Sequence, residues 1–535
     1  MKKIIYILSL LASLPVVGLA QTTTENFVMT ETMLGAASNS SSLKAVQYYN
    51  GLGYPTVGVA TTGGDGQTSY SLTTYDALSR EERQYLPVAT DNSIAYKEPT
   101  VIIDSLISFY KNGNTAYTQN HYDAFDRPVS IEQPGQAWRT ADRRVTMAYA
   151  ANTANDKVLR YTASSANNTL TATGQYYAAG TLTKETAKDP DEKPVVTFKD
   201  LFGNVILQRA GSNLDTYYVY DELGQLRFVL PPAFTTSDNN ASKAIYRYEY
   251  RYDKRGRVIT KLLPGAEYIE YWHDTADRVI CMQDAMMRKA GKYRFTIYDQ
   301  FGRVAIQGLC TNYQNKGNHN ANPAVTATYT PSSAGFLNTG YTVSNATTLF
   351  PGATLEAVNY YDGYDFVSKN HNSRFTSMSV TTTVSQTGQL TGSTMIAGNG
   401  EWLSQVMAYD LKGNLLETKS REIGGRIVTR TNTYSYTNKV KTSNSSIDVG
   451  YGNKMTIKET YGYNAKNDQK SSYNLSIAHG NSAVSSKTNY TYNALGQLST
   501  VTRPLTSGVK TVSYTYDMHG WQKKITTNSF SEELF

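Results

Sequence analysis

The sequence has little cysteine, little tryptophan and, after residue 20, no long apolar run. Two of its 535 residues are cysteine, which is too few for a disulfide scaffold. No later apolar stretch approaches the ~20 residues that a spanning helix needs, so we expect no transmembrane segment. The net charge of +7 is small for this length, and the charges are interspersed. This pattern does not indicate a nucleic-acid partner.

Residues of the kinds that carry catalysis or bind metals are also scarce. The six histidines show none of the spacings typical of a metal site. His273 is interpreted as structural, and His519 lies inside a turn, where we expect it to be exposed. Cys281 and Cys310 could form one bond after export, but two buried thiols fit equally well. With no P-loop and no G-x-S-x-G motif, we predict no enzyme activity, no catalytic residue, no metal and no cofactor.

The first twenty residues have the pattern of a secretory signal peptide. Lys2 and Lys3 precede an apolar stretch over residues 4–19, and Gly18 and Ala20 place small residues before Gln21. We predict cleavage after Ala20, and the alternative is an N-terminal membrane anchor. No cysteine follows the cleavage point, so lipoprotein anchoring is not indicated. The mature chain is therefore expected in the periplasm, at the cell surface or outside the cell.

Tyrosine is the residue in excess, with 43 Tyr against 15 Phe and 4 Trp. Tyr and Thr suit the half-buried surface of a pleated sheet. A tyrosine ring can pack while its hydroxyl remains in water. This composition favours an all-β protein with a limited dry core. Rows of tyrosine could also stack against sugar rings, although cross-strand packing explains them as well.

A short motif recurs thirteen times: Tyr, then Asp or Asn, two variable residues, and then usually Gly. Asp or Asn stands at the second position in all thirteen copies, and three residues later eight copies have Gly. Tyr252-Asp253-Lys254-Arg255-Gly256-Arg257 is a complete copy, whereas His273 and Lys199 replace the tyrosine in two others. The turn residues that we single out as structural sites are Tyr75, Asp76, Tyr122, Asp123, Asp221, Gly224, Asp253, Gly256, Asp299, Gly302, Asp410, Gly413, Asn493, Gly496, Asp517 and Gly520.

The chemistry of these residues predicts a hairpin turn. Asp or Asn at the first position of a type I turn accepts a hydrogen bond from the main-chain N–H two residues later. The fourth position then enters the left-handed region, which Gly adopts freely and Asn or Asp tolerate. Turn capping therefore explains the repeated carboxylates better than a calcium or catalytic site does. Gly63-Gly64-Asp65-Gly66 is interpreted as a further turn, and Asp189-Pro190-Asp191-Glu192 is too short for a calcium loop.

The Y-D-x-x-G-R pattern followed by an apolar strand resembles the YD repeat of Rhs-type proteins, which teneurin ectodomains share. The motif covers most of residues 190–310 and 400–520. Residues 21–160 resemble the uncharacterised domain that opens Rhs-type proteins of Bacteroidetes, through Gln47-Tyr48-Tyr49-Asn50-Gly51-Leu52-Gly53-Tyr54-Pro55 and the segment around Gln133-Pro134-Gly135 and Trp138. The resemblance implies stacked β-hairpins that form a strip able to close into a hollow shell.

The family's complete proteins continue into a conserved core segment and a variable toxin, and this sequence stops at Phe535 without either. We therefore expect an incomplete shell whose sheet ends on an open edge. The expected organisation is a signal peptide (1–20), an N-terminal β-rich domain (21–160), YD repeats (161–310), a polar insertion (311–358), and further YD repeats that end incomplete (359–535).

The function expected from these features is that of a non-enzymatic, exported scaffold, a β-shell segment of an Rhs-type system. Its partner would be another Rhs-type chain or an enclosed polypeptide. The alternative is a cell-surface adhesin or carbohydrate-binding protein, on the grounds of the tyrosine rows.

Overall fold

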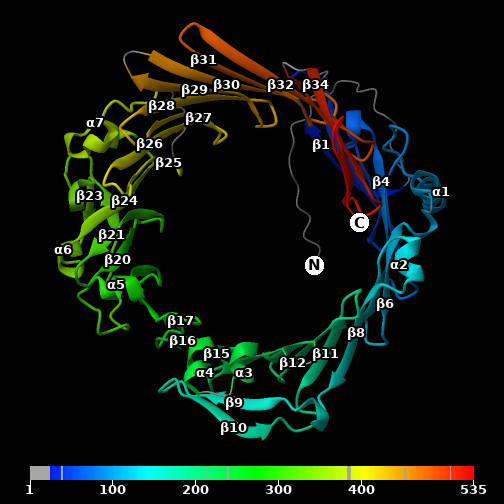
Figure 1. Cartoon of the computed structure of the whole chain (residues 1–535), viewed down its shortest axis with the longest axis horizontal. Helices are drawn as coiled ribbons and strands as arrows, with labels where there is room; N and C mark the ends of the chain where they lie inside the picture. The colour runs from blue at the N-terminus through cyan, green and yellow to red at the C-terminus, as the bar shows by residue number, and fades with distance from the viewer. Residues whose placement is uncertain are drawn as a thin grey trace.

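A computed structural model describes residues 25–534 except 38–39, 112, 212–213, 238–239, 382–386, 451–452 and 506–507. The expected signal peptide lies outside the described residues. Within them, 32 strands form one antiparallel sheet. The sheet curves into a ring around an open centre, and the strands near its two ends lie side by side (Figure 1). The expectation of an all-β strip of hairpins is confirmed.

The strands of the sheet follow each other along the chain. The first part of the ring contains β1 (Asn26–Met33), β2 (Ser42–Tyr49), β3 (Pro55–Ala60), β4 (Ser69–Tyr75), β5 (Glu81–Ala89), β6 (Tyr117–Tyr122), β7 (Pro128–Glu132), β8 (Arg144–Ala151), β11 (Thr183–Lys188), β12 (Pro194–Lys199), β13 (Val205–Ala210), β14 (Leu214–Tyr220), β15 (Leu226–Leu230), β16 (Tyr248–Tyr252) and β17 (Val258–Leu262). The second part contains β18 (Ile269–His273), β19 (Val279–Gln283), β20 (Tyr293–Tyr298), β21 (Val304–Cys310), β24 (Thr354–Tyr361), β25 (Leu390–Ile396), β26 (Trp402–Tyr409), β27 (Leu415–Arg421), β28 (Ile427–Tyr434), β29 (Val440–Gly450), β30 (Asn453–Tyr463), β31 (Lys470–His479), β32 (Ser482–Tyr492), β33 (Leu498–Leu505), β34 (Gly508–Tyr516), β35 (Gln522–Thr526) and β36 (Ser531–Glu533).

The helices and two separate hairpins lie in the connections. They are α1 (Pro99–Tyr110), α2 (Gln136–Thr140), α3 (Pro232–Thr236), α4 (Asn240–Tyr246), α5 (Ala285–Lys289), α6 (Ala346–Leu349), α7 (Asp365–Ser368), the short 3-10 turns η1 (Gly64–Gly66), η2 (Gly113–Thr115), η3 (Ala154–Asp156), η4 (Phe336–Asn338) and η5 (Asn370–Phe375), and the hairpins of β9 (Leu159–Ala163) with β10 (Leu170–Tyr176) and β22 (Ala327–Tyr329) with β23 (Tyr341–Val343). No helix in the described part of the chain is long and apolar enough to span a membrane.

Strand pairing gives the strip two different edges. Each strand of the sheet pairs with its sequence neighbours in the sheet, and β8 pairs directly with β11. Because consecutive connections of such a meander alternate between edges, all thirteen motif turns lie along one edge, which we call the repeat edge. The connections with α1, α3, α4, α5 and residues 311–353 lie along the opposite edge. The ladder also passes without a break across the expected domain boundary at residue 160, through the β8–β11 pair.

The apolar face of the sheet points outward. Three clusters of buried side chains lie between the sheet and α1, between the sheet and the β9–β10 hairpin, and between the sheet and residues 311–380. Figure 1 places α1, β9–β10, β23, α6 and α7 outside the ring of strands. The expected polar insertion at 311–358 therefore covers the largest of these clusters, with Phe350 and Tyr313 fully buried.

The inner wall is consequently the polar, tyrosine-bearing face. Side chains alternate between the faces of a strand, so outward Val46 and Tyr48 leave Gln47 and Tyr49 inward. The register carries this assignment from Val406 of β26 through to β30, where Thr460 faces outward. Tyr461 and Tyr463 therefore line the centre of the ring. The wall combines rings with hydroxyl groups rather than a dry apolar surface.

Candidate functional site

The turn at residues 253–257 shows the geometry that is typical of the turns along the repeat edge. Asp253 Oδ1 accepts hydrogen bonds from the main-chain N–H of Arg255 (2.8 Å) and Arg257 (3.0 Å). Asp253 Oδ2 accepts from Arg257 Nε at 2.7 Å, and the carboxylate is 1% exposed. Gly256 has φ 78°, the left-handed conformation that closes the turn. In this copy Asp253 caps the turn and Gly256 adopts the left-handed conformation, as the motif predicts.

The other singled-out turn residues lie along the same edge, with two departures elsewhere in the series. The fourth position is left-handed in eleven of the thirteen copies, including Ser79, Asp126 and Asp277. In the copy that starts at Asp362, that aspartate itself is left-handed and a long connection follows. In the copy that starts at Asn464, the left-handed residue is Asp468, one position later. These two copies also match the motif less well in sequence, since neither has Gly at the fourth position.

The motif tyrosine joins nine of the thirteen repeats to the preceding one. Tyr252 Oη donates a hydrogen bond to the Leu226 carbonyl at 2.7 Å, the residue that follows the preceding turn. The nine motif tyrosines and Tyr434, which precedes a similar turn at Ser435, donate to the corresponding carbonyl of the previous repeat at 2.7–3.0 Å, namely Tyr75, Tyr122, Tyr252, Tyr298, Tyr361, Tyr409, Tyr434, Tyr463, Tyr492 and Tyr516. This hydrogen bond explains why most copies carry tyrosine and not phenylalanine at this position.

We expect Tyr252→Phe to lower the free energy of unfolding by about 1 kcal/mol, because it removes one neutral hydrogen bond. Adding Tyr409→Phe and Tyr492→Phe should bring the loss to about 3 kcal/mol, since distant sites are usually additive. Urea unfolding measures the effect. Tyr54→Phe is the matched control, because no partner of the Tyr54 hydroxyl is found among the described residues. Equal losses in the control and in Tyr252→Phe would contradict this role of the hydroxyl.

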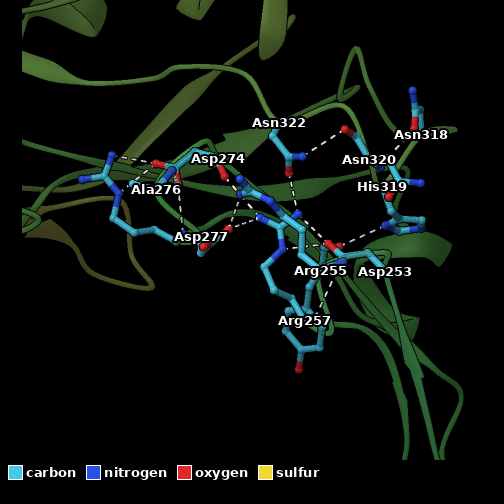
Figure 2. Close-up of polar contacts among 12 residues, drawn as sticks. Asp253, Arg255, Arg257, Asp274, Ala276, Asp277, Asn318, His319, Asn320 and Asn322 are labelled. Atoms are coloured by element: carbon cyan, nitrogen blue, oxygen red, sulfur yellow. Dashed lines mark hydrogen bonds and ion pairs between the residues drawn. The ribbon is translucent and has the colours of Figure 1, made fainter. Parts of the chain in front are cut away.

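Arginine at the end of the motif connects successive turns in the forward direction. Arg257 Nη1 contacts Asp277 Oδ1 at 2.7 Å and the Asp274 carbonyl at 3.3 Å, both in the next turn (Figure 2). Its Nη2 donates to Asn322 Oδ1 at 2.6 Å, so one guanidinium also holds the insertion against the repeat edge. The guanidinium is 11% exposed. Charged hydrogen bonds of this kind are stronger than neutral ones.

The same connection recurs where arginine closes other turns. Arg80 Nη1 reaches the Asp123 carbonyl at 3.1 Å and Asp126 Oδ1 at 2.9 Å. Arg303 Nη2 contacts Asp362 Oδ2 at 2.6 Å. At these turns the repeat edge carries carboxylate–guanidinium contacts, and the carboxylates already have partners. This arrangement supports the cap interpretation over a calcium or catalytic one.

These contacts predict how stability depends on pH. Burial by itself raises the pKa of Asp253, and hydrogen bonds from the Arg257 guanidinium and two main-chain N–H groups outweigh burial, so the pKa lies below 3.8. Arg303 lowers the pKa of Asp362 in the same way. A carboxylate with a lowered folded-state pKa contributes stability above its unfolded pKa, and this is lost as the pH falls through the folded value.

We therefore expect the urea midpoint to be steady from pH 7 to about 5 and to fall progressively below about pH 4. Asp253→Asn should show a smaller decline, because one of the titrating groups has gone. A midpoint that stays constant down to about pH 2.5 would contradict the assignment.

The ring closes where the repeat edge of its last strands meets the opposite edge of its first strands. Gly64 in η1, between β3 and β4, donates its N–H to the Asn493 carbonyl at 2.8 Å. Asn467 Nδ2 donates to the Gly63 carbonyl at 2.7 Å. Asn467 and Gly63 are more than 400 positions apart in the sequence. We call this contact, together with the contact between His519 and Pro134, the seam.

A second contact extends the seam to β7–β8 and β34–β35. His519 Nε2 lies 3.0 Å from the Pro134 carbonyl, and its Nδ1 lies 3.2 Å from Asp517 Oδ2. The His519 ring stacks on Trp521, with 4.7 Å between centroids, and Trp138 contacts both rings. The His519 side chain is 12% exposed, so the expectation of an exposed histidine was wrong. Its neighbour across the seam is 385 residues away in sequence, which no local signal reveals.

Because one edge meets the other, the ring is one turn of a shallow spiral. In the described part of the chain, β1 pairs only with β2, and β36 pairs only with β35. Side-chain and loop contacts therefore hold the two ends together, and no strand ladder between described residues crosses the seam.

The remaining candidates for chemistry have structural surroundings. His273 is buried, and burial, followed by nearby Arg257, lowers its pKa. Cys281 and Cys310 are both buried free thiols, and burial, with Cys310 beside it, raises the pKa of Cys281. No group of three or more potential metal ligands occurs within the described residues.

Two further turns of the same geometry escaped the sequence reasoning. Ser435 occupies the aspartate place, with its Oγ accepting from the Lys439 N–H at 3.1 Å and Asn438 left-handed. Asp189, on the opposite edge, caps the N–H groups of Asp191 and Lys193. In both segments a short polar side chain preceded a left-handed residue by three positions, and this signal could have identified them.

Comparison with known proteins identifies one segment. Residues 21–151 match DUF6443, a domain of unknown function. No curated protein matches the chain. Among solved structures, the chain is similar to "Crystal Structure of TcdB2-TccC3" (14% identity, TM-score 0.48) and "Crystal Structure of TcdB2-TccC3-Cdc42" (13% identity, TM-score 0.47), covering 94% of this chain and 23% of each of those. It is also similar to the Tc holotoxin pore of Photorhabdus luminescens (14% identity, TM-score 0.44), covering 94% of this chain and 22% of that one. The chain thus spans less than a quarter of each of these proteins.

Proposed function

We propose that this chain is a non-enzymatic, exported scaffold that forms a section of a hollow β-shell in an Rhs-type system. The observation that carries the proposal is the closure of one continuous sheet into a ring, with its apolar face outward and its tyrosine face toward an open centre (Figure 1). A fold built only to bury a core would place its apolar face inside. Here the covering layers lie outside, and the centre is left for something else.

The partner in this proposal is a polypeptide inside the shell or another Rhs-type chain. The inner wall favours an unfolded or loosely folded polypeptide, because tyrosine rings and hydroxyls offer adaptable contacts rather than one shaped pocket. Export through the N-terminal signal segment would place the shell in the periplasm, at the cell surface or outside the cell.

Cryo-electron microscopy of residues 21–535 tests the architecture. We expect a curved strip or ring with an open centre, and compact separate globules would contradict the proposal. Enclosure is tested separately by appending an unstructured, protease-sensitive segment after Phe535. A seam variant that opens the ring should shorten the lifetime of this segment under protease. Equal lifetimes with intact rings would reject enclosure while leaving the scaffold architecture in place.

The second candidate is carbohydrate binding, favoured by one groove on the inner wall. The groove has a volume of about 760 Å³ and is lined by side chains of β26–β30 that include Arg430, Asn432, Glu459 and Tyr461. Its floor is the middle of a paired sheet, so no main-chain group is free to bind a peptide strand. Recognition would have to use side chains, as saccharide sites commonly do.

The polar groups of this groove suit a neutral saccharide. Arg430 uses Nε to contact Ser445 Oγ at 3.1 Å, and no partner of its Nη groups is found in the described part of the chain. Glu459 Oε1 accepts from Tyr461 and Tyr473, which leaves Oε2 available. Two cations and two anions line the groove, the cations being Arg430 and Lys439 and the anions Glu422 and Glu459. Planar guanidinium and carboxylate groups can each bind two neighbouring hydroxyls.

A panel of neutral oligosaccharides tests this candidate. Binding should fall about tenfold or more in Arg430→Ala and in Glu459→Gln, since each removes charged hydrogen bonds. Lys458→Ala, on the outward face of β30, is the matched control and should bind normally. No binding above background by the native chain would reject carbohydrate recognition at this groove.

A further inference from the structure

The repeat edge carries a row of exposed apolar side chains at one fixed place in the motif. Counting the aspartate or asparagine as first, this is the third turn position. Six of these residues are leucine or phenylalanine and are 69–91% exposed, namely Leu52, Leu78, Phe125, Phe202, Leu223 and Phe301. Their exposure means that they add nothing to the core of this chain. Such a row on one edge marks an interaction surface.

The turn itself does not require apolar residues there. Arg255 and Lys412 occupy the same position in turns of the same geometry. In eleven of the thirteen copies the main-chain N–H of the third residue donates to the side-chain oxygen of the first, as Phe202 does to Asp200 at 2.9 Å. This bond fixes the main chain of the turn, and the side chains of the third residues are left outside it. Leucine and phenylalanine are therefore a property of the surface and not of the turn.

The seam shows what the third turn position can do. Three turns of the repeat edge take part in the seam, and their third residues are Lys466, Leu495 and His519. Lys466 Nζ pairs with Asp65 at 3.1 Å, and His519 contacts the Pro134 carbonyl. The same position that docks one edge of the strip inside this chain is occupied elsewhere on the edge by exposed Leu and Phe.

We propose that the repeat edge binds a second copy of this chain, so that two rings stack repeat edge to repeat edge. The row follows the curve of the ring, and a partner must have the same curvature to cover all six side chains at once. A second copy always has it. The repeat edge follows one turn of a shallow spiral. A spiral is unchanged by a two-fold rotation about an axis perpendicular to its own axis, so two copies related by that rotation have matching edges. This symmetry gives an isologous two-fold contact.

The charges along the repeat edge agree with this orientation. Several carboxylates beside the row are paired with arginine within their own turns, as in Asp76–Arg80, Asp123–Arg127 and Asp299–Arg303, whereas Asp200 is capped by neutral Asn204. These ion pairs reduce the repulsion between two approaching repeat edges. Long connections lie on both edges, since residues 152–182 and 362–389 leave from the repeat edge, so the choice of this edge rests on the apolar row. The two-ring assembly would cover one mouth of each ring and deepen the enclosed space, whatever occupies it.

Analytical ultracentrifugation of residues 21–535 tests the proposal. The native chain should sediment as a dimer in the micromolar range. The triple variant Leu78→Glu, Phe125→Glu and Phe202→Glu should raise the dissociation constant by about 100-fold or more, because it places charges in an apolar contact. Its circular dichroism should be unchanged, since all three side chains are exposed. The single variant Phe202→Ser, at the most exposed position, serves if the triple variant does not fold.

The matched control places three glutamates on exposed apolar positions of the opposite edge. Ile107→Glu, Met286→Glu and Ile423→Glu should leave the dimer intact. A native chain that stays monomeric, or a dimer that the repeat-edge triple does not weaken, would overturn the proposal. So would electron micrographs in which opposite edges meet.

Lipid is the competing occupant of an apolar row. Flotation with vesicles of phosphatidylethanolamine and phosphatidylglycerol separates it from a second copy. Flotation of a monomeric native chain that is lost in the repeat-edge triple would assign the row to a membrane surface and overturn the dimer.

Discussion

Replacing Gly64 with alanine is expected to open the ring. A Cβ at Gly64 would collide with the main-chain carbonyl oxygens of Asn493 and Tyr492. Neither oxygen can rotate away, because both belong to the end of β32 and its turn. The N–H of Gly64 also makes the 2.8 Å bond to Asn493 across the seam. Overpacking of this kind typically costs about 1–3 kcal/mol, and separating the two edges relieves it.

The result should be an open strip and not an unfolded chain, because the strand ladder on each side of the seam is untouched. Small-angle scattering should show a larger radius of gyration, and micrographs should show arcs in place of rings. Gly51→Ala is the matched control, since a Cβ there meets no atom within 4 Å. If Gly64→Ala keeps the dimensions of the native ring, the seam is not what closes it.

Replacing Asp253 with asparagine should cause the largest loss of stability from a single turn. Asparagine keeps an oxygen for the two main-chain N–H groups, but its amide turns a donor toward the Arg257 guanidinium. That guanidinium is 11% exposed and loses the carboxylate that stands 2.7 Å from its Nε. Removing one partner of a buried ion pair costs about 3 kcal/mol or more. Urea unfolding should report this loss.

Another turn of this chain suggests a second substitution that should offset the loss of stability in Asp253→Asn. Asn493 and Gln497 occupy the corresponding positions of another turn, where Asn493 Nδ2 donates to Gln497 Oε1 at 2.7 Å. Adding Arg257→Gln to Asp253→Asn should therefore recover part of the stability, with the remainder lost because the contacts to Asp277 and Asn322 have gone. A double-mutant cycle measures this coupling. Additive losses in the double variant would show that the two side chains do not act as a pair.

The sequence predicted the local chemistry of the repeat edge because that chemistry depends on neighbours in the chain. The cap by Asp253 and the left-handed Gly256 both lie within one turn, so residue type and spacing suffice. The motif does not identify a turn in which another residue type performs the same task, as Ser435 does. The motif is also incomplete where the turn gains a residue, as at Asp468, because a single insertion shifts the position that must be left-handed.

The residues of the seam carried weak local signals. Gly63 and Gly64 were interpreted as a turn between strands, and they do form one. Their second property, close approach to the carbonyls of β32, depends on how far the sheet curves over some 400 residues. His519 was expected in solvent for the same reason, because an isolated turn would expose it.

The sequence by itself determined the turn residues and the all-β class, since both follow from contacts between near neighbours. Only the tertiary structure decided which face is inside, to which carbonyl each tyrosine hydroxyl donates, and that the two ends of the strip meet. These features depend on the accumulated twist and curvature of the sheet and on the insertions that cover its outer face. A small bend at each strand pair is invisible in any one repeat, and the sum of these bends around the sheet makes the ring.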